Sequence, residues 1–352
     1  YDKVYDFDRN GESHARFHPT HLPPAHTLVP LAEMGSETEY LKHAQRRWSQ
    51  IVHHSAWLSL LTRLHGVSRR EAVRFISVSQ PHAGDFLNAV PKHAPYRLST
   101  WAMRLVLRRR LGLPVALVDE RRRSKHGKEF DELGDVAQND GTQGHQTRHF
   151  LLLQALVDAA RSVWGGVVRR EPADYPSYSN TRPDLSAEGK GKGGGKLVGD
   201  LKLFASVGSD GEPHIRGSLV AFGNTLPHAQ ELVHGLPGRG QPGDGAWRWA
   251  KGYGYVAPVA GAYARALDAG CDVKCLLFET WGGWSPEVVE LFRELAEERQ
   301  NRLTKSEYDE TTWSARTWLS FQAQKISVAL QYAVALELSN ALGLANASDS
   351  AI

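Results

Sequence analysis

Apolar residues recur at helical spacing through the first third of the chain. Between about residues 38 and 112 they fall three or four positions apart, which places them on one face of a helix. The last of these predicted helices carries Trp101, Leu105 and Val106 and ends before Gly112. The polar residues 1–35 predict an extended N-terminal arm, and residues 120–145 predict a long polar loop.

The hydrophobic pattern changes near residue 146. Gln146–Trp164 has an amphipathic helical pattern, whereas Lys196–Phe204 alternates between apolar and polar residues as a strand does. Ser285-Pro286-Glu287 predicts a helix start, because it supplies a capping hydroxyl, a proline in the first turn and an acid near the positive end of the helix dipole. We therefore predict an α/β domain over 146–345, whose first elements run helix, strand, strand, strand, helix and strand (146–164, 166–172, 182–185, 196–204, 258–269 and 273–279), with a last long helix over 312–343.

The composition is that of an ordinary globular protein. Of the 352 residues, 41% are hydrophobic and 23% are charged, which excludes wholesale disorder. No run approaches the roughly 18 apolar residues of a membrane span. The two cysteines, Cys271 and Cys275, are too few for a disulfide scaffold or a cysteine-based zinc finger.

Basic residues are concentrated locally, although the net charge is only +3. Arg104–Lys125 contains eight basic residues against two acidic ones, and further lysines lie in a glycine-rich stretch near residue 190. Such a stripe fits a polyanionic partner, and it fits a solvated helix face equally well. The residues that we predict to bind nucleic acid, in a helical DNA-binding or linker region over 36–119 and beyond it, are Arg108, Arg109, Arg110, Arg121, Arg122, Arg123, Arg148, Lys190 and Lys192.

One set of residues carries a pattern with chemical consequences. Pro183-Asp184 is followed sixteen residues later by Asp200-Leu201-Lys202, and Pro-Asp occurs once in the chain. Strand alternation places Asp200 and Lys202 on one face, and a neighbouring strand would bring Asp184 beside them. Two carboxylates can hold Mg²⁺ or Mn²⁺, and an ammonium group can orient the attacking water in phosphodiester hydrolysis. The alternative is a strand with one solvated face.

Two further residues are candidate auxiliaries. Glu171 follows a predicted strand and is a candidate third metal ligand, or it pairs with Arg169 or Arg170. His149 lies on the inward stripe of its helix, either as a histidine at the edge of the core or as a contact to phosphate or to a metal-bound water. The metal ligands that we expect are therefore Asp184, Asp200 and Glu171.

The order of these segments resembles the restriction-like endonuclease region that follows the reverse transcriptase in one class of non-LTR retrotransposons, above all algal and protist copies. The segments that carry the resemblance are Arg148-His149, Arg169–Pro172, Arg182–Leu185 and Asp200–Lys202. Flanking segments that are also similar are Ser79–Pro91, Leu107–Leu113, Val220–Thr225, Phe278–Pro286 and Ser314–Phe321. The resemblance covers roughly residues 55–335. It implies the α/β core of PD-(D/E)xK nucleases, preceded by a helical region and followed by long C-terminal helices.

The resemblance also implies an activity: nicking of target DNA, which exposes a 3′ hydroxyl for target-primed reverse transcription. Asp184, Asp200 and Lys202 would then take the catalytic positions, with Glu171 and His149 as auxiliaries. Element RNA and an upstream reverse transcriptase or larger assembly are further candidate partners. The expected location is the nucleus for a eukaryotic retroelement and otherwise the cell interior, with no membrane involved.

Two departures from that family stand out. Its members usually carry a Cys/His zinc knuckle before the Arg-His pair, whereas residues 120–147 contain no cysteine and only His126 and His145. We therefore expect no structural zinc. No paired aspartates of a reverse transcriptase precede the nuclease region, so the chain is a fragment, a solo descendant or one component of an assembly. The competing interpretation is a catalytically degenerate nucleic-acid-binding or scaffold protein derived from such a nuclease.

Overall fold

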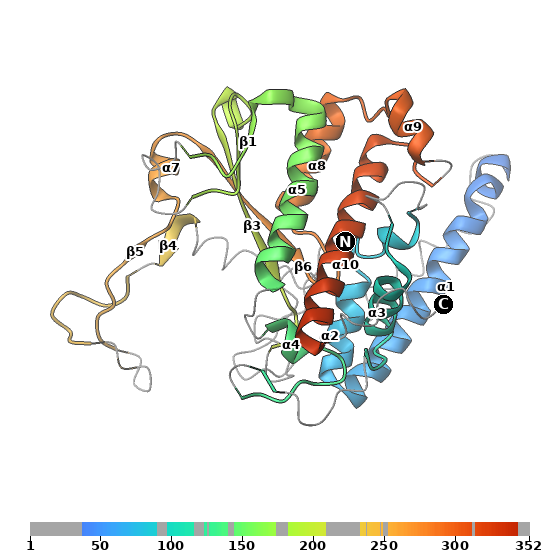
Figure 1. Ribbon diagram of the computed structural model, residues 1–352, viewed down its shortest axis with the longest axis horizontal. Helices are drawn as coiled ribbons and strands as arrows, with labels where there is room; N and C mark the ends of the chain where they lie inside the picture. Colours follow the sequence, from blue (N-terminus) through green and yellow to red (C-terminus); the bar gives the residue numbers. More distant parts are fainter. Residues whose placement is uncertain are drawn as a thin grey trace.

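The computed structural model describes residues 37–89, 97–115, 123–124, 127–139, 144–173, 182–208, 233–236, 238–246, 248, 253–311 and 314–343. Within these ranges the chain is a mixed α/β protein with a small mixed sheet (Figure 1). Outside the described residues lie the predicted N-terminal arm, the predicted DNA-binding residues 121 and 122, and the segment 220–225.

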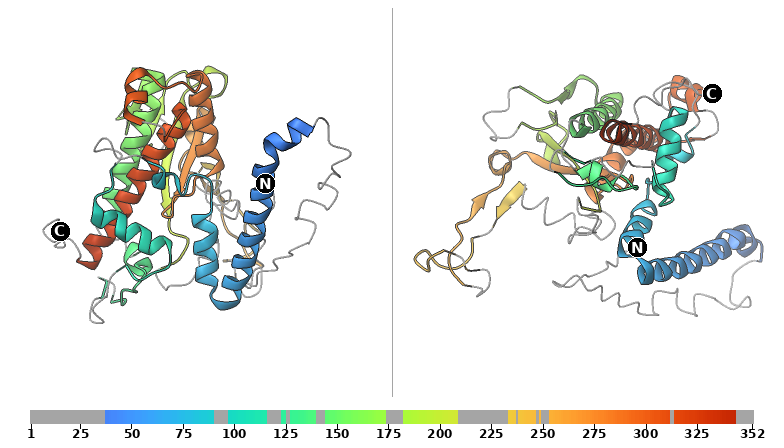
Figure 2. Two further views of the ribbon diagram at one scale, coloured as in Figure 1. Left: turned by 90° about the vertical axis from the view of Figure 1, so that its right-hand side faces the viewer. Right: turned by 60° about the horizontal axis from the view of Figure 1, so that its bottom comes forward.

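The predicted helical region is present. It comprises α1 (Glu37–Val67), α2 (Arg69–Val78) and α3 (Thr100–Arg110). Ser68 separates the first two helices and caps the second, because its hydroxyl accepts a hydrogen bond from the Glu71 amide. A small cluster with Leu61 and Ile76 at its centre joins α1 to α2. Figure 2 shows that this helical pair lies to one side of the α/β core.

Four strands form the central sheet in the order β1 (Val168–Arg170), β2 (Leu185–Ala187), β3 (Leu197–Phe204) and β6 (Asp272–Glu279). The first three pair antiparallel, and β3 pairs parallel with β6. A parallel neighbour requires a crossover, which contains the short helix α7 (Ala264–Asp268). The predicted order of helix, three strands, helix and strand is therefore confirmed for α5, β1–β3, α7 and β6.

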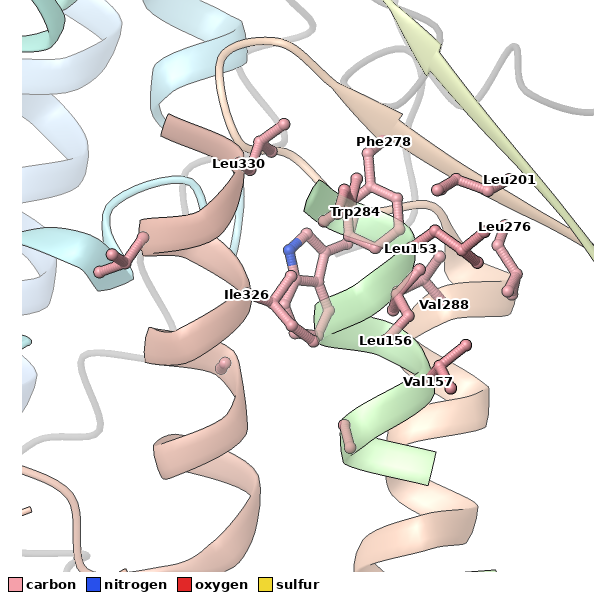
Figure 3. Close-up of a cluster of buried hydrophobic side chains, with 14 of the residues drawn as sticks. Leu153, Leu156, Val157, Leu201, Leu276, Phe278, Trp284, Val288, Ile326 and Leu330 are labelled. Atoms are coloured by element: carbon pink, nitrogen blue, oxygen red, sulfur yellow. The ribbon is translucent and has the colours of Figure 1, made fainter. Parts of the chain in front are cut away.

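Helices α5 (Gly144–Trp164) and α8 (Pro286–Glu298) cover one face of this sheet, and α10 (Trp318–Leu342) packs against both helices. Ser285 caps α8 as predicted, and Thr317 begins α10 with a capping box. Figure 3 shows side chains from α5, β3, β6, α8 and α10 meeting in one core, with Trp284 among them. By length and composition alone, residues 145–167 could cross a membrane, but one stripe of the segment, which includes Leu152, Leu153, Leu156 and Val157, packs in this core.

Several boundaries differ from the predictions. The helix predicted over 258–269 contracts to α7, because β5 (Val259–Ala260) pairs with β4 (Gly235–Leu236) at the base of a protruding arm (Figure 1). The polar loop over 120–145 contains a short helix, α4 (Asp135–Asn139). The pattern also missed α9 (Lys305–Thr311). Asp184 precedes β2 instead of lying within it.

Candidate functional site

Pairing between β2 and β3 brings the two predicted aspartates together. Leu185 lies opposite Gly199, and the Asp184 amide donates to the Gly199 carbonyl at 3.0 Å. Asp184 therefore comes next to Asp200 on the adjacent strand. Lys202 follows two residues along β3, on the same face as Asp200. The structure thus assembles the predicted Asp-Asp-Lys set at the edge of the short strand β2.

Both carboxylate oxygens of Asp184 are held in place. The Leu201 amide donates to Oδ2 at 2.6 Å, and His149 Nε2 on α5 lies 3.2 Å from Oδ1. This hydrogen bond to Asp184 is the main reason why the pKa of His149 is raised above its ordinary value. Each carboxylate oxygen can accept more than one contact, so Asp184 keeps acceptor capacity. His149 is therefore a direct partner of a candidate metal ligand.

Asp200 lies almost wholly inside the protein, where 2% of its surface is exposed. Its Oδ1 accepts a hydrogen bond from the Tyr263 hydroxyl at 2.6 Å. Its Oδ2 forms an ion pair with Lys202, whose Nζ lies 3.0 Å away. Burial raises the pKa of the Asp200 carboxyl, and the nearby Asp184 acts in the same direction, while Lys202 and Tyr263 oppose them. Asp200 is thus a buried carboxylate with one oxygen directed at the ammonium group of Lys202.

Glu171 does not join this group through its side chain. Its amide donates to the Asp184 carbonyl at 2.8 Å, and its own carbonyl accepts from the Arg182 guanidinium. Its carboxylate instead lies 3.9 Å from Arg170 Nε. Its backbone has a positive φ of 42°, which a non-glycine residue rarely adopts. The structure therefore supports the pairing alternative for Glu171, and not ligation of a metal beside Asp184 and Asp200.

Two arginines that we predicted to bind nucleic acid lie inside the protein. Arg109 is 2% exposed, lies 3.3 Å from Asp135 Oδ1, and covers the Trp281 ring at 3.6 Å. Arg148 donates to Glu337 at 2.7 Å and is equally enclosed. The predicted phosphate contacts are wrong for this pair, because both guanidinium groups are buried among internal partners.

The other predicted basic residues differ in their surroundings. Arg110 donates to the backbone carbonyls of residues 78 and 83, so it is half-buried and structural. Arg108 and Arg123 are exposed, the latter beside Glu129. Lys190 lies 2.6 Å from Glu298, and Lys192 is exposed. The exposed members stay candidates for phosphate contact, although Lys190 already has an acidic partner.

The cysteines are not part of this chemistry. Cys275 lies beside Asp200 in the register of β3 and β6, and burial raises the pKa of its thiol to about 12. The thiol therefore stays protonated at neutral pH and is a poor metal ligand. Across the described residues, no cluster of three or more His, Cys, Asp or Glu side chains is placed to hold a metal ion.

Tyr263 is the residue of this site that sequence reasoning missed. It lies sixty-three residues beyond its partner Asp200, and no local motif marks it. No protein-family model, curated protein or solved structure matches the chain. The candidate site therefore consists of His149, Asp184, Asp200, Lys202 and Tyr263, joined by the contacts described above.

Proposed function

We propose that this protein is a divalent-metal-dependent endonuclease that nicks DNA by phosphodiester hydrolysis. The observation that carries the proposal is the convergence of Asp184, Asp200 and Lys202, in which one buried oxygen of Asp200 lies 3.0 Å from the Lys202 ammonium group. Burying a carboxylate is costly unless a partner compensates the charge. A lysine alone would serve a structural role, but the second carboxylate at the same place adds like charge, which a purely structural site would avoid.

The donor set fits a hard divalent cation. Asp184 and Asp200 would hold Mg²⁺ or Mn²⁺, with water and substrate phosphate completing the coordination, as is usual for Mg²⁺ bound by one or two carboxylates. Zinc fits poorly, because the Cys275 thiol beside Asp200 is protonated. When bound, the cation would supply Lewis-acid stabilisation and a water of lowered pKa.

The chain's own residues divide the remaining work. Lys202 presents a partly exposed ammonium group beside Asp200, where it can orient a nucleophilic water and offset charge that develops on the phosphate. The Leu201 amide and His149 fix the Asp184 carboxylate between them, so little reorganisation is needed when substrate arrives. His149 would thereby position Asp184, and its protonated form can also face a phosphate oxygen.

The architecture supports a finer proposal. A helix, an antiparallel three-strand meander, a crossover helix and a parallel fourth strand form the arrangement expected of a PD-(D/E)xK core. The resemblance to the retroelement nuclease region then suggests nicking in target-primed reverse transcription, with DNA, element RNA and an associated reverse transcriptase as partners. A nuclear location follows for a eukaryotic element.

Plasmid nicking tests the activity. The protein should convert supercoiled DNA to the open circle with Mg²⁺ or Mn²⁺ but not with EDTA. Asp184→Ala, Asp200→Ala and Lys202→Ala should each abolish nicking. Matched controls are Asp272→Ala and Glu188→Ala, which remove carboxylates from other Asp/Glu-x-Lys triplets that lie outside the site.

The second candidate function is a catalytically degenerate DNA-binding protein, favoured by the absence of the Glu171 carboxylate from the cluster. Tight DNA binding without nicking under any divalent metal would establish it. Full activity of Asp200→Ala would refute the proposed site, even if the chain nicks DNA.

A further inference from the structure

Tyr263 is fully buried and contacts the candidate catalytic site through its hydroxyl. The hydroxyl donates to Asp200 Oδ1 at 2.6 Å, a short bond of the kind that a charged acceptor forms. The other oxygen, Oδ2, is the one near Lys202. The two oxygens of Asp200 thus have different environments. Oδ1 is hydrogen-bonded to a buried side chain, and Oδ2 faces Lys202 in the candidate site.

The ring of Tyr263 is held by packing that does not involve the site. Val198, Ala266 and Cys271 form a small buried cluster with it on the α7 side of β3. Tyr263 also precedes the first residue of α7, so the helix fixes its backbone. A buried aromatic side chain in such surroundings has little rotamer freedom. The hydroxyl is therefore a rigid donor and not an adaptable one.

We propose that Tyr263 is a positioning residue, which orients the Asp200 carboxylate so that Oδ2 faces the divalent cation. This inference rests on the proposed nuclease function. Removal of the hydroxyl frees Oδ1, and the carboxylate can then rotate toward Lys202 and share both oxygens with the ammonium group. Hydrogen bonds that orient a metal ligand typically contribute 10- to 100-fold in metal affinity.

The test is Tyr263→Phe, which keeps the packed ring and removes only the hydroxyl. Mn²⁺ affinity is measured by isothermal titration calorimetry on the full chain without DNA, and nicking is measured across Mn²⁺ concentrations. We expect Mn²⁺ to bind at least about 10-fold more weakly, with nicking recovering at high Mn²⁺. Tyr332→Phe, which alters a tyrosine beside Trp101 outside the site, is the matched control.

The outcomes separate this inference from the function on which it rests. If the parent binds Mn²⁺ and nicks DNA while Tyr263→Phe has the parental affinity, the positioning role is refuted and the nuclease stands. If the parent neither binds Mn²⁺ nor nicks DNA, both proposals fail. A second variant, Tyr263→Gln, retains a side-chain donor and should bind Mn²⁺ more tightly than the Phe variant. Loss of the folded state in both variants would also overturn the inference, since the hydroxyl would then be a requirement of folding itself.

Discussion

The buried arginine Arg109 gives the sharpest test of how this structure uses its basic residues. Its guanidinium lies between Asp135 and Gln138 on one side and the face of Trp281 on the other. Burial lowers the pKa of Arg109, but an arginine remains charged at neutral pH. We change Arg109 to Met, which keeps an apolar stem against Trp281 and removes the charge.

The expected cost follows from the partners that remain. Removing one member of a buried ion pair typically destabilises a protein by about 3–5 kcal/mol, because the other charge stays buried. Here Asp135 keeps a second cation, since Arg70 Nε donates to it at 2.9 Å. The loss should therefore lie near the lower end, about 3 kcal/mol of unfolding free energy.

Urea unfolding measures this loss, and Arg108→Met provides the control. Arg108 is exposed on the same helix and donates to the Pro114 carbonyl, so its replacement should change stability by less than about 0.5 kcal/mol. Arg109→Met should leave the salt dependence of DNA binding unchanged, because a buried guanidinium releases no counterion. An unchanged unfolding midpoint together with a reduced salt slope would refute this assignment and restore the phosphate-binding interpretation.

Three further predictions follow from burial and charge. Asp200→Asn should abolish nicking while the melting temperature of the metal-free protein stays level or rises, since burial raises the pKa of this carboxyl; a fall measured by differential scanning fluorimetry would contradict this. The second variant is His149→Gln. In the parent, the bond to Asp184 raises the pKa of His149. The stabilisation that protonated His149 gives the fold is therefore complete below its pKa in the unfolded chain, about 6.5, and is lost as the pH rises through its pKa in the folded protein. Urea unfolding should therefore show a larger stability difference between parent and variant near about pH 5.5 than near about pH 8.5. The difference should stay below about 1 kcal/mol, because the site is partly solvated. A larger difference at the higher pH would contradict the reasoning. Leu153→Ala in the core should cost about 3 kcal/mol in urea unfolding, whereas Val67→Ala on the surface should cost less than about 0.5 kcal/mol, and equal costs would refute the core assignment.

Local signals located most of the elements. The capping sequence at Ser285 predicted the start of α8, and the alternation before Phe204 predicted β3, because both depend on neighbouring residues alone. The crossover helix was predicted too long, since the pairing of β5 with β4 competes for its first residues. Strand β2 has three residues, which is too short for alternation to define its ends.

The site was only partly predictable for a related reason. Spacing along one strand places Asp200 and Lys202 together, but only the register of β2 against β3 places Asp184 beside them. Tyr263 reaches Asp200 from a distant segment, so no pattern near either residue announces the contact. The basic helix α3 posed the same difficulty: its charge pattern is the same whether an arginine faces water or an acid supplied by another helix.

The strand β3 explains why the charged set lies where it does. It pairs antiparallel with β2 over Leu197–Gly199 and parallel with β6 along its whole length, so Asp200 lies just beyond the end of β2. Asp200 is nonetheless buried, with the Tyr263 hydroxyl on one of its oxygens, whereas Lys202 near the strand end remains partly exposed. Where His149 is neutral, two adjacent carboxylates with a single ammonium group leave an excess of negative charge, which the metal-free fold tolerates at a cost. A cation bound there would offset this charge, and ligand linkage then predicts that saturating Mn²⁺ at 100 times its dissociation constant stabilises the fold by about 2.7 kcal/mol. On the proposed function, the negative charge of the two carboxylates destabilises the metal-free site and also attracts the cation.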